Sequence, residues 1–263
     1  MRSPVYILLV SAILLGAREA SLHEGAQGQD RIAISQDAAL DPAGARRTTA
    51  PSPAARIVRS TSLDIADKSS IESLDTEELR ARIRRGERGT YIGEILLARD
   101  SSLTRWPERV EKPLRVWVAD GSSLPDWRPD FPSRVREAFT EWSLAGIPVL
   151  FTFVVDSSDA DIHVSWEDQF DQPISGKTHW SRDRRWWIVG GSIVLALHHN
   201  ERETLDGPAI RAIALHEVGH LLGLDHSVDT SNIMTSRVRV RDLSDADRAT
   251  IKLLYSLPPG SIR

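Results

Sequence analysis

Three histidines, one glutamate and one glycine are spaced between residues 216 and 226 as an open metal site requires. The segment reads HEVGHLLGLDH, from His216 to His226. On an α-helix, side chains four positions apart are separated by about 40° around the axis and lie one turn above the other. His216 and His220 can therefore bind one ion. Because imidazole nitrogen is a preferred ligand of Zn²⁺, the spacing predicts a zinc site.

The remaining residues of the motif have separate expected roles. Glu217 follows His216 directly, so its carboxylate would meet a water on the metal rather than the metal itself, as a general base should. The helix cannot continue to His226, because six positions beyond His220 lie about 240° further around the axis. Gly223 allows the chain to turn, since a residue without Cβ adopts the left-handed conformation at little steric cost. His226 then becomes the third ligand, and water takes the fourth position.

The alternative is that these are ordinary surface or capping histidines on an amphipathic helix. The chain contains eight histidines in 263 residues. In such a composition, chance is a poor explanation for five residues at these fixed positions, so a metal site is favoured. The HExxH part of the motif alone would have been a much weaker signal.

A methionine follows the histidine motif. Met234, the one methionine besides the initiator, comes eight residues after His226 within the segment SNIMT. The two motifs together resemble the metzincin metallopeptidases, in which a methionine-containing turn runs beneath the zinc. The His-Ser pair at 226–227 and the closing segment at 243–255 resemble the matrixin branch, the matrix metalloproteinase-like enzymes. The resemblance implies that Met234 supports the site without binding zinc, and packing as core filler is compatible with this role.

The resemblance implies an α+β fold, the zincin-like metzincin catalytic domain, with a mixed twisted sheet, an active-site helix and a C-terminal helix. Apolar residues at i, i+3, i+4 and i+7 predict a helix over 132–145 that stops at Gly146. The metal-binding helix should begin near residues 206–208. Alternating or apolar runs predict strands at 114–118, 149–155, 161–166, 177–181 and 187–197.

The segment that would meet the substrate is also suggested by resemblance. It resembles the matrixin edge strand, against which an extended polypeptide pairs antiparallel, and consists of Gly176, Lys177, Thr178 and His179. Animal matrixins hold a second, structural zinc in this region with three histidines and an aspartate, of which only His179 has a counterpart. We therefore expect one catalytic Zn²⁺.

Other polar residues near this segment leave two questions open. Asp168 and Asp171 are candidate Ca²⁺ ligands, with solvated loop carboxylates as the alternative. His198 and His199 are neighbours on an extended segment, so their side chains point to opposite faces and cannot easily chelate one ion. We assign them to a loop.

The N-terminus has the pattern of an export signal. One positive charge precedes an apolar run of about a dozen residues, which is typical of a secretory signal peptide over 1–20. The run is short for a membrane span, which needs about 20 apolar residues. The sequence predicts a secreted protein, extracellular or periplasmic. The alternative is an uncleaved signal that anchors the chain in a membrane.

Residues 21–109 are expected to form a flexible leader and propeptide, followed by the catalytic domain over 110–263. Within the leader, the pattern indicates a charged helix over 70–85 and a short strand or extended segment over 91–97. The chain contains no cysteine, so it lacks the propeptide thiol that keeps animal matrixin zymogens silent. Asp100 is a candidate replacement, and a loop aspartate that faces water is the alternative.

Together these features predict a secreted zinc endopeptidase of the class that acts on the extracellular matrix. Its partner would be a polypeptide substrate, and the chain is expected to be monomeric. The net charge of −4 gives no indication of nucleic-acid binding. A non-peptidase zinc hydrolase and a binding module that keeps zinc for shape remain as alternatives. The module is disfavoured because structural zinc sites usually close all four positions with protein ligands.

Overall fold

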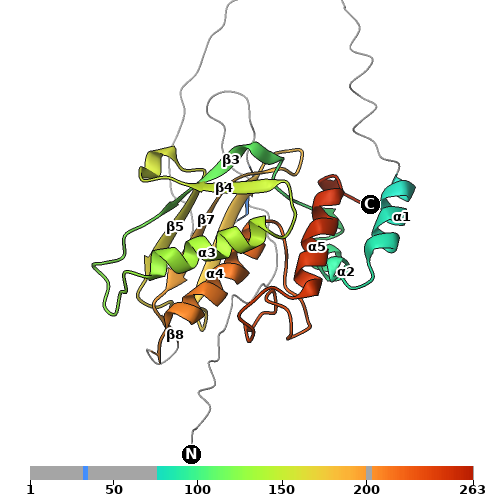
Figure 1. The fold of residues 1–263 in the computed structure, drawn as a ribbon. Coiled ribbons are helices and arrows are strands. Elements are labelled where there is room, and N and C mark those ends of the chain that lie inside the picture. The colour runs from blue at the N-terminus through green and yellow to red at the C-terminus, as the bar shows by residue number, and fades with distance from the viewer. Residues whose placement is uncertain (1–31, 35–75, 200–202, 263) are drawn as a thin grey trace, which may run out of the picture.

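The computed structural model describes residues 32–34, 76–199 and 203–262. Two helices lie across one face of a mixed sheet, and the C-terminal helix stands beside them with the two N-terminal helices (Figure 1). The helices are α1 (Thr76–Gly86), α2 (Ile92–Ala98), α3 (Phe131–Ser143), a short 3₁₀ turn (Ser157–Asp159), α4 (Gly207–Leu221) and α5 (Asp245–Ser256). This arrangement is the α+β fold expected for a metzincin catalytic domain.

The main sheet has six strands in the order β1-β6-β7-β5-β3-β4. Strand β3 is parallel to β4 and β5, β5 is parallel to β7, and β6 is antiparallel to both β7 and β1. The strands are β1 (Ile32–Ile34), β2 (Ser102–Leu103), β3 (Arg109–Val118), β4 (Val149–Phe153), β5 (Ile162–Glu167), β6 (Gly176–Arg182), β7 (Ile188–Ala196), β8 (His198–His199), β9 (Glu203–Thr204) and β10 (Gly260–Ser261). The five strands expected from the sequence are confirmed as β3, β4, β5, β6 and β7.

Helix α4 is buried over almost its entire length, in contrast to an ordinary amphipathic helix. Its N-terminus is capped by Asp206, whose Oδ1 accepts a hydrogen bond of 2.8 Å from the backbone N–H of Ala209. From Ala209 to Leu221 only Arg211 is not buried. A helix enclosed in this way presents its side chains in fixed directions, because tight packing leaves few alternative rotamers.

Helix α3 packs on α4 through its apolar face. That face carries the residues expected from the periodicity, namely Val135, Ala138, Phe139 and Trp142, all fully or almost fully buried. The Trp142 indole N–H donates a hydrogen bond of 2.8 Å to the backbone carbonyl of Leu215 on α4. This bond fixes the position of α3 along α4. Its acceptor, Leu215, directly precedes His216, the first histidine of the motif.

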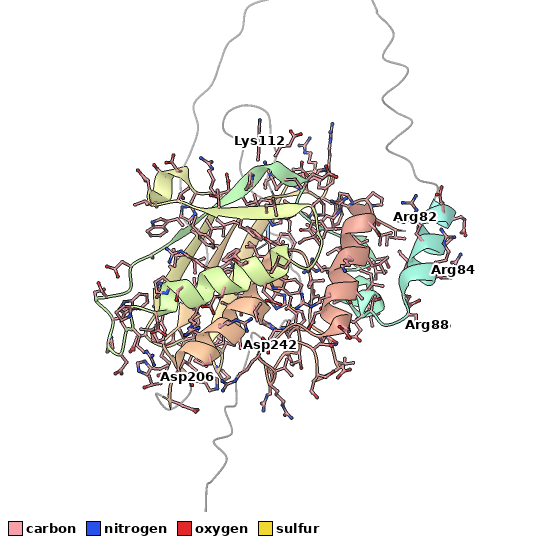
Figure 2. All side chains as sticks on the ribbon, in the orientation of Figure 1. Arg82, Arg84, Arg88, Lys112, Asp206 and Asp242 are labelled. Atoms are coloured by element: carbon pink, nitrogen blue, oxygen red, sulfur yellow. The ribbon has the colours of Figure 1, made fainter. Side chains whose placement is uncertain are left out.

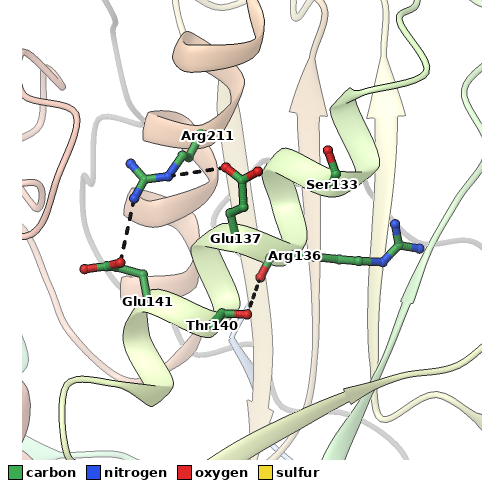
Figure 3. Close-up of a pocket in the computed structure, with 6 residues that line it drawn as sticks. All are labelled: Ser133, Arg136, Glu137, Thr140, Glu141 and Arg211. Carbon is green, nitrogen blue, oxygen red and sulfur yellow. Dashed lines mark hydrogen bonds and ion pairs between the residues drawn. The ribbon is translucent and has the colours of Figure 1, made fainter.

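An open groove of about 410 Å³ lies over the exposed sides of α3 and α4. Figure 3 shows Arg211 of α4 directed at Glu137 and Glu141 of α3. Arg211 also donates to Asp242 at 2.9 Å, and Glu141 is paired with Arg248. The groove is therefore a surface ion-pair network, and none of the three motif histidines lines it.

The short strand or extended segment expected over 91–97 was wrong, because residues 92–98 form helix α2. The segment is only seven residues long, and its apolar residues are too few for periodicity to separate a helix from a strand. Ile92 and Ile95 are spaced by three positions, are fully buried, and belong to the same core as α4. A helix places both of these side chains on the side of the segment that packs into the core.

The charged helix expected within 70–85 is present as α1 over the part of it that the structure describes. Glu77 and Glu78 lie in its first turn and Arg84 and Arg85 in its last, which suits the helix dipole. Figure 2 shows Arg82, Arg84 and Arg88 projecting away from the body of the protein. Leu79 and Ile83 point inward and are buried.

We expect replacement of Trp142 by Phe to lower the free energy of unfolding by about 1–3 kcal/mol. The change would remove the indole donor that the buried carbonyl of Leu215 accepts in addition to its helical N–H, while keeping most of the apolar volume. Urea unfolding of both proteins measures the difference. The matched control is Trp117→Phe on β3, a half-buried indole, for which a clearly smaller loss is expected. Equal losses would show that the hydrogen bond does not fix the two helices.

Candidate metal centre

The three histidines of the motif converge on one point. The Nε2 atom of His220 lies 3.0 Å from Nε2 of His216 and 3.2 Å from Nε2 of His226. A tetrahedral zinc site with Zn–N distances of about 2.0–2.1 Å requires N···N separations of about 3.3 Å. The observed separations fit this requirement. Among the described residues no other group of three His, Cys, Asp or Glu side chains comes together in this way.

The other ring nitrogens of two histidines are held by backbone carbonyls. His216 Nδ1 donates to Ile233 O at 2.8 Å, and His220 Nδ1 donates to Leu224 O at 3.1 Å. A neutral imidazole that donates from Nδ1 keeps the lone pair on Nε2, which is the tautomer that a metal ligand needs. The carbonyls therefore fix both the orientation and the tautomer of these rings.

The environment of the cluster favours uncharged imidazoles. Burial, followed by repulsion from His220 and His226, lowers the pKa of His216 well below its usual range. Burial also lowers the pKa of His220 well below that range, and it lowers the pKa of His226. The three rings are thus neutral near pH 7, with lone pairs available to a cation.

The chain turns at Gly223, as the spacing predicts. Its φ is +102°, in the region that favours glycine, and a Cβ at this position would collide with the backbone carbonyl of Thr104. After the turn, the chain brings His226 back to the end of α4. Gly223 is required for two reasons, the backbone angle and the close approach of the segment that contains Thr104.

Every backbone carbonyl in the last turn of α4 has a donor, although helix ends normally leave such groups without intrahelical partners. Trp106 Nε1 donates to Leu221 O at 2.8 Å, and Tyr255 OH donates to Leu222 O at 3.1 Å. The remaining carbonyls accept backbone N–H groups of Leu222, Gly223 and Leu224. The end of the helix is consequently fixed by side chains from distant parts of the chain.

Met234 lies against the middle of α4, fully buried. Its thioether sulfur faces Gly219, where any side chain would collide with it. The Met234 carbonyl accepts the backbone N–H of Ser227 at 2.8 Å. The turn therefore packs under the helix that carries His216 and His220, and the preceding residue, Ile233, holds the His216 ring.

A buried aspartate links this turn to two helices. Asp247 of α5 accepts hydrogen bonds from the Ile233 N–H at 2.9 Å and from the Tyr91 hydroxyl at 2.9 Å. It also forms a capping box with Ser244 at the start of α5. Ile233 therefore bonds to His216 through its carbonyl and to Asp247 through its N–H. The Asp247 carboxylate in turn links this residue to the start of α5 and to Tyr91 before α2.

Glu217 is fully buried and has two different oxygen environments. Its Oε2 accepts a hydrogen bond of 2.6 Å from the Thr178 hydroxyl, whereas its Oε1 faces Gly176 and has no hydrogen-bond partner among the described residues. Burial raises the pKa of Glu217 to about 7, and the bond from Thr178 opposes this rise. A cation beside the carboxylate would favour its ionised form. A buried acceptor without a partner, on the residue that follows His216 on α4, fits a site made for an ion and a water.

The four expected substrate-binding residues lie at the start of β6 and divide between its two faces. Alternation along a strand places Gly176 and Thr178 on the face that meets α4, and Lys177 and His179 on the other. Thr178 contacts Glu217 through both its carboxylate and its backbone carbonyl. This support for Glu217 was not foreseen, because a strand pattern does not show what the strand packs against. Strand β1 pairs with Trp180 to Arg182 further along β6.

The remaining histidines have other partners. His198 lies between two carboxylates, with Nε2 3.0 Å from Asp126 and Nδ1 2.8 Å from Asp168, while His199 Nδ1 is 2.7 Å from the Ser175 hydroxyl. The two rings thus have different partners, although they form the short strand β8 rather than the expected loop. Asp168 is thus paired with His198. Calcium binding by Asp168 and Asp171 stays a prediction.

The matrixin family model matches residues 125–256. The chain is 25% identical over 150 residues to Metalloendoproteinase 1 of Glycine max, covering 49% of this chain and 47% of that protein. It is 36% identical over 92 residues to Metalloendoproteinase 2-MMP of Arabidopsis thaliana, covering 34% and 23%. It is 27% identical over 173 residues to Matrix metalloproteinase-C of Caenorhabditis elegans, covering 59% and 28%. The matches span less than half of each relative.

We expect His220→Ala to lose tightly bound zinc, because two nitrogen ligands and water hold the ion far less strongly than three. Elemental analysis of purified protein after dialysis measures the zinc content, and circular dichroism checks the fold. His163→Ala is the matched control, since His163 is exposed on β5 and bonds to Ser157 O. Stoichiometric zinc in the His220 variant would contradict the assignment of His220 as a ligand.

Proposed function

Because the chain belongs to the matrixin family, we propose that it is a secreted zinc-dependent endopeptidase that cleaves extended polypeptides. The observation that carries the proposal is the convergence of three uncharged imidazoles, two of them buried and that of His226 half-buried, at the helix that also carries the buried carboxylate of Glu217. Such a set leaves one coordination position for water, as catalytic zinc sites do. His216, His220 and His226 would hold the ion, and Met234 would support the helix beneath them.

When bound, zinc would supply a Lewis acid that activates water and stabilises the developing oxyanion. Glu217 accepts the proton of the attacking water and passes it to the leaving amine. Its position suits this role, because Thr178 holds Oε2 and leaves Oε1 without a protein partner. Burial raises the pKa of Glu217 to about 7 without a cation nearby, and the bound ion would favour the carboxylate, which is the form that accepts a proton. No covalent enzyme intermediate is required.

The start of β6 is the proposed substrate-binding edge. An extended peptide would pair antiparallel with the backbone of residues 176–179, a common mode of peptide recognition. Gly176 and Thr178 adjoin Glu217, so a peptide on this edge would pass the general base. The side chains of Lys177 and His179, on the opposite face, would not be needed for this backbone pairing.

Secretion, latency and the domain boundaries stay predictions. The expected signal peptide over 1–20 and most of the leader over 21–109 lie outside the described residues. Asp100 is described and has a positive φ of 53°, and its role in latency remains a proposal. Among the described residues, no helix combines the length and the apolarity needed to cross a bilayer. We further propose a monomer with one zinc ion.

The reaction class can be tested directly. The zinc-loaded protein, in full length or trimmed before α1, is incubated with a random peptide library and, in parallel, with acyl ester and non-peptide amide substrates. Internal cleavage of peptides that depends on zinc supports an endopeptidase. Turnover confined to the non-peptide substrates would instead identify the alternative, a zinc hydrolase of another class. Zinc binding without any turnover would favour the binding module.

Glu217→Ala should retain zinc and the fold but reduce peptide cleavage by about 10²–10⁴-fold, the usual contribution of a positioned general base. The zinc content and kcat/KM on a library-derived peptide are measured together. Glu111→Ala is the matched control, because Glu111 is an exposed glutamate on β3. Cleavage by the Glu217 variant at a near wild-type rate would refute the assigned role.

A further inference from the structure

An arginine from outside the matrixin match reaches the loop that carries the third histidine. Arg99 follows α2 as its C-terminal cap residue, 126 positions before Asp225 in the sequence. Its side chain is 15% exposed, and that of Asp225 is 9% exposed. The contact is therefore a largely buried ion pair, which differs from the exposed pairs on α1 and is less screened by solvent.

The first connection runs from Arg99 to His226. Arg99 Nε donates to Asp225 Oδ2 at 2.9 Å, and the other oxygen of the same carboxylate, Oδ1, accepts the backbone N–H of His226 at 2.8 Å. The carboxylate of Asp225 is thus held from both sides. Because it bonds to the backbone of the third ligand, its position determines where the His226 ring is presented.

The second connection runs from Arg99 to His220. Arg99 Nη2 donates to the carbonyl of Leu224 at 3.0 Å, and the same carbonyl accepts the bond from His220 Nδ1 at 3.1 Å. The oxygen that fixes the His220 tautomer is therefore itself held by the guanidinium. One side chain contacts the hydrogen-bond partners of two of the three metal-binding residues.

The third contact connects Arg99 to the proposed substrate strand. Its guanidinium carbon lies 5.3 Å from the centre of the Trp180 ring on β6, within the range of a cation–π interaction. Trp180 is two positions beyond Thr178 on the same face of the strand. A planar guanidinium can make all three contacts at once, because its donors form a rigid fork and its face can stack on an aromatic ring.

We propose that Arg99 is a positioning residue for the metal centre, which sets the orientation of His220 through Leu224 and of His226 through Asp225. The proposal rests on the proposed zinc function. Partners of metal ligands in this position typically contribute 10–100-fold to metal affinity or activity, because they hold the ligands in the productive orientation before the ion arrives. The residue lies before the family match at 125–256, so the motif alone does not reveal it.

The test compares zinc affinity in the full-length protein and its Arg99→Gln and Arg99→Lys variants by competition with a chromophoric chelator. Arg99→Gln should weaken zinc binding about 10-fold or more. Arg99→Lys should recover part of the loss, because an ammonium can reach one of the two acceptors but lacks the fork. The visible spectrum of the Co²⁺-substituted protein should change in Arg99→Gln, which reports on ligand geometry independently of activity.

Two further variants separate positioning from general stability. Asp225→Asn removes the charge that Arg99 meets and should weaken zinc binding in the same direction, with less than additive loss in the double variant. Arg105→Gln is the matched control: Arg105 precedes the family match as well, but it donates to Leu257 O and stacks on Trp187. It should lower the unfolding free energy of the metal-free protein and leave the zinc affinity unchanged.

Unchanged zinc affinity and an unchanged Co²⁺ spectrum in Arg99→Gln would overturn the positioning role of Arg99. The proposed function would still stand if the wild-type protein binds zinc and cleaves peptides. Equal losses of affinity in Arg99→Gln and Arg105→Gln would also overturn it, since the effect would then follow from stability. Failure of the wild-type protein to bind zinc would overturn both proposals. If Arg99→Gln does not fold, Asp225→Asn answers the same question.

Discussion

The packing around α4 depends on keeping two uncharged imidazoles buried on this helix, with the half-buried imidazole of His226 beside them. Burial strips the rings of water and lowers the pKa values of His216, His220 and His226, which leaves their lone pairs available. Buried polar rings are stable only when their N–H groups have acceptors. The carbonyls of Ile233 and Leu224 are those acceptors for the first two rings. Each of these two carbonyl groups must lie in a turn of defined shape, because its oxygen has to point at the ring.

Those turns explain why segments distant in sequence pack around α4. Asp247 holds the turn that contains Ile233, while Trp106 and Tyr255 bond to the carbonyls at the end of the helix. The helix also needs small residues where other segments approach it. Gly219 leaves space for the Met234 sulfur, and Gly223 leaves space for the Thr104 carbonyl. The core and the site are therefore built by the same contacts.

The sequence predicts the parts of this arrangement that depend on short spacing. His216 and His220 are one helical turn apart, and the turn at Gly223 follows from the need to bring His226 back, so local geometry suffices for both. The strands and helices could be placed along the chain from their patterns together with the resemblance, whereas the order of the strands in the sheet was not predicted. Residues 91–97 were misassigned because the segment is too short for its period to show. The roles of Thr178 and Arg99 could not be predicted, because each depends on which distant element it packs against.

The packing of residues 92–106 has a consequence for maturation. Trp106 is fully buried and closes the end of α4, and Ile92, Ile95 and Leu103 fill the core beside it. A protease that trimmed the chain at residue 109 would remove these side chains and expose the carbonyl of Leu221 to solvent. A cut before α1 would leave them in place. The position of a cut would thus decide whether the shortened chain keeps the side chains that fix the end of α4.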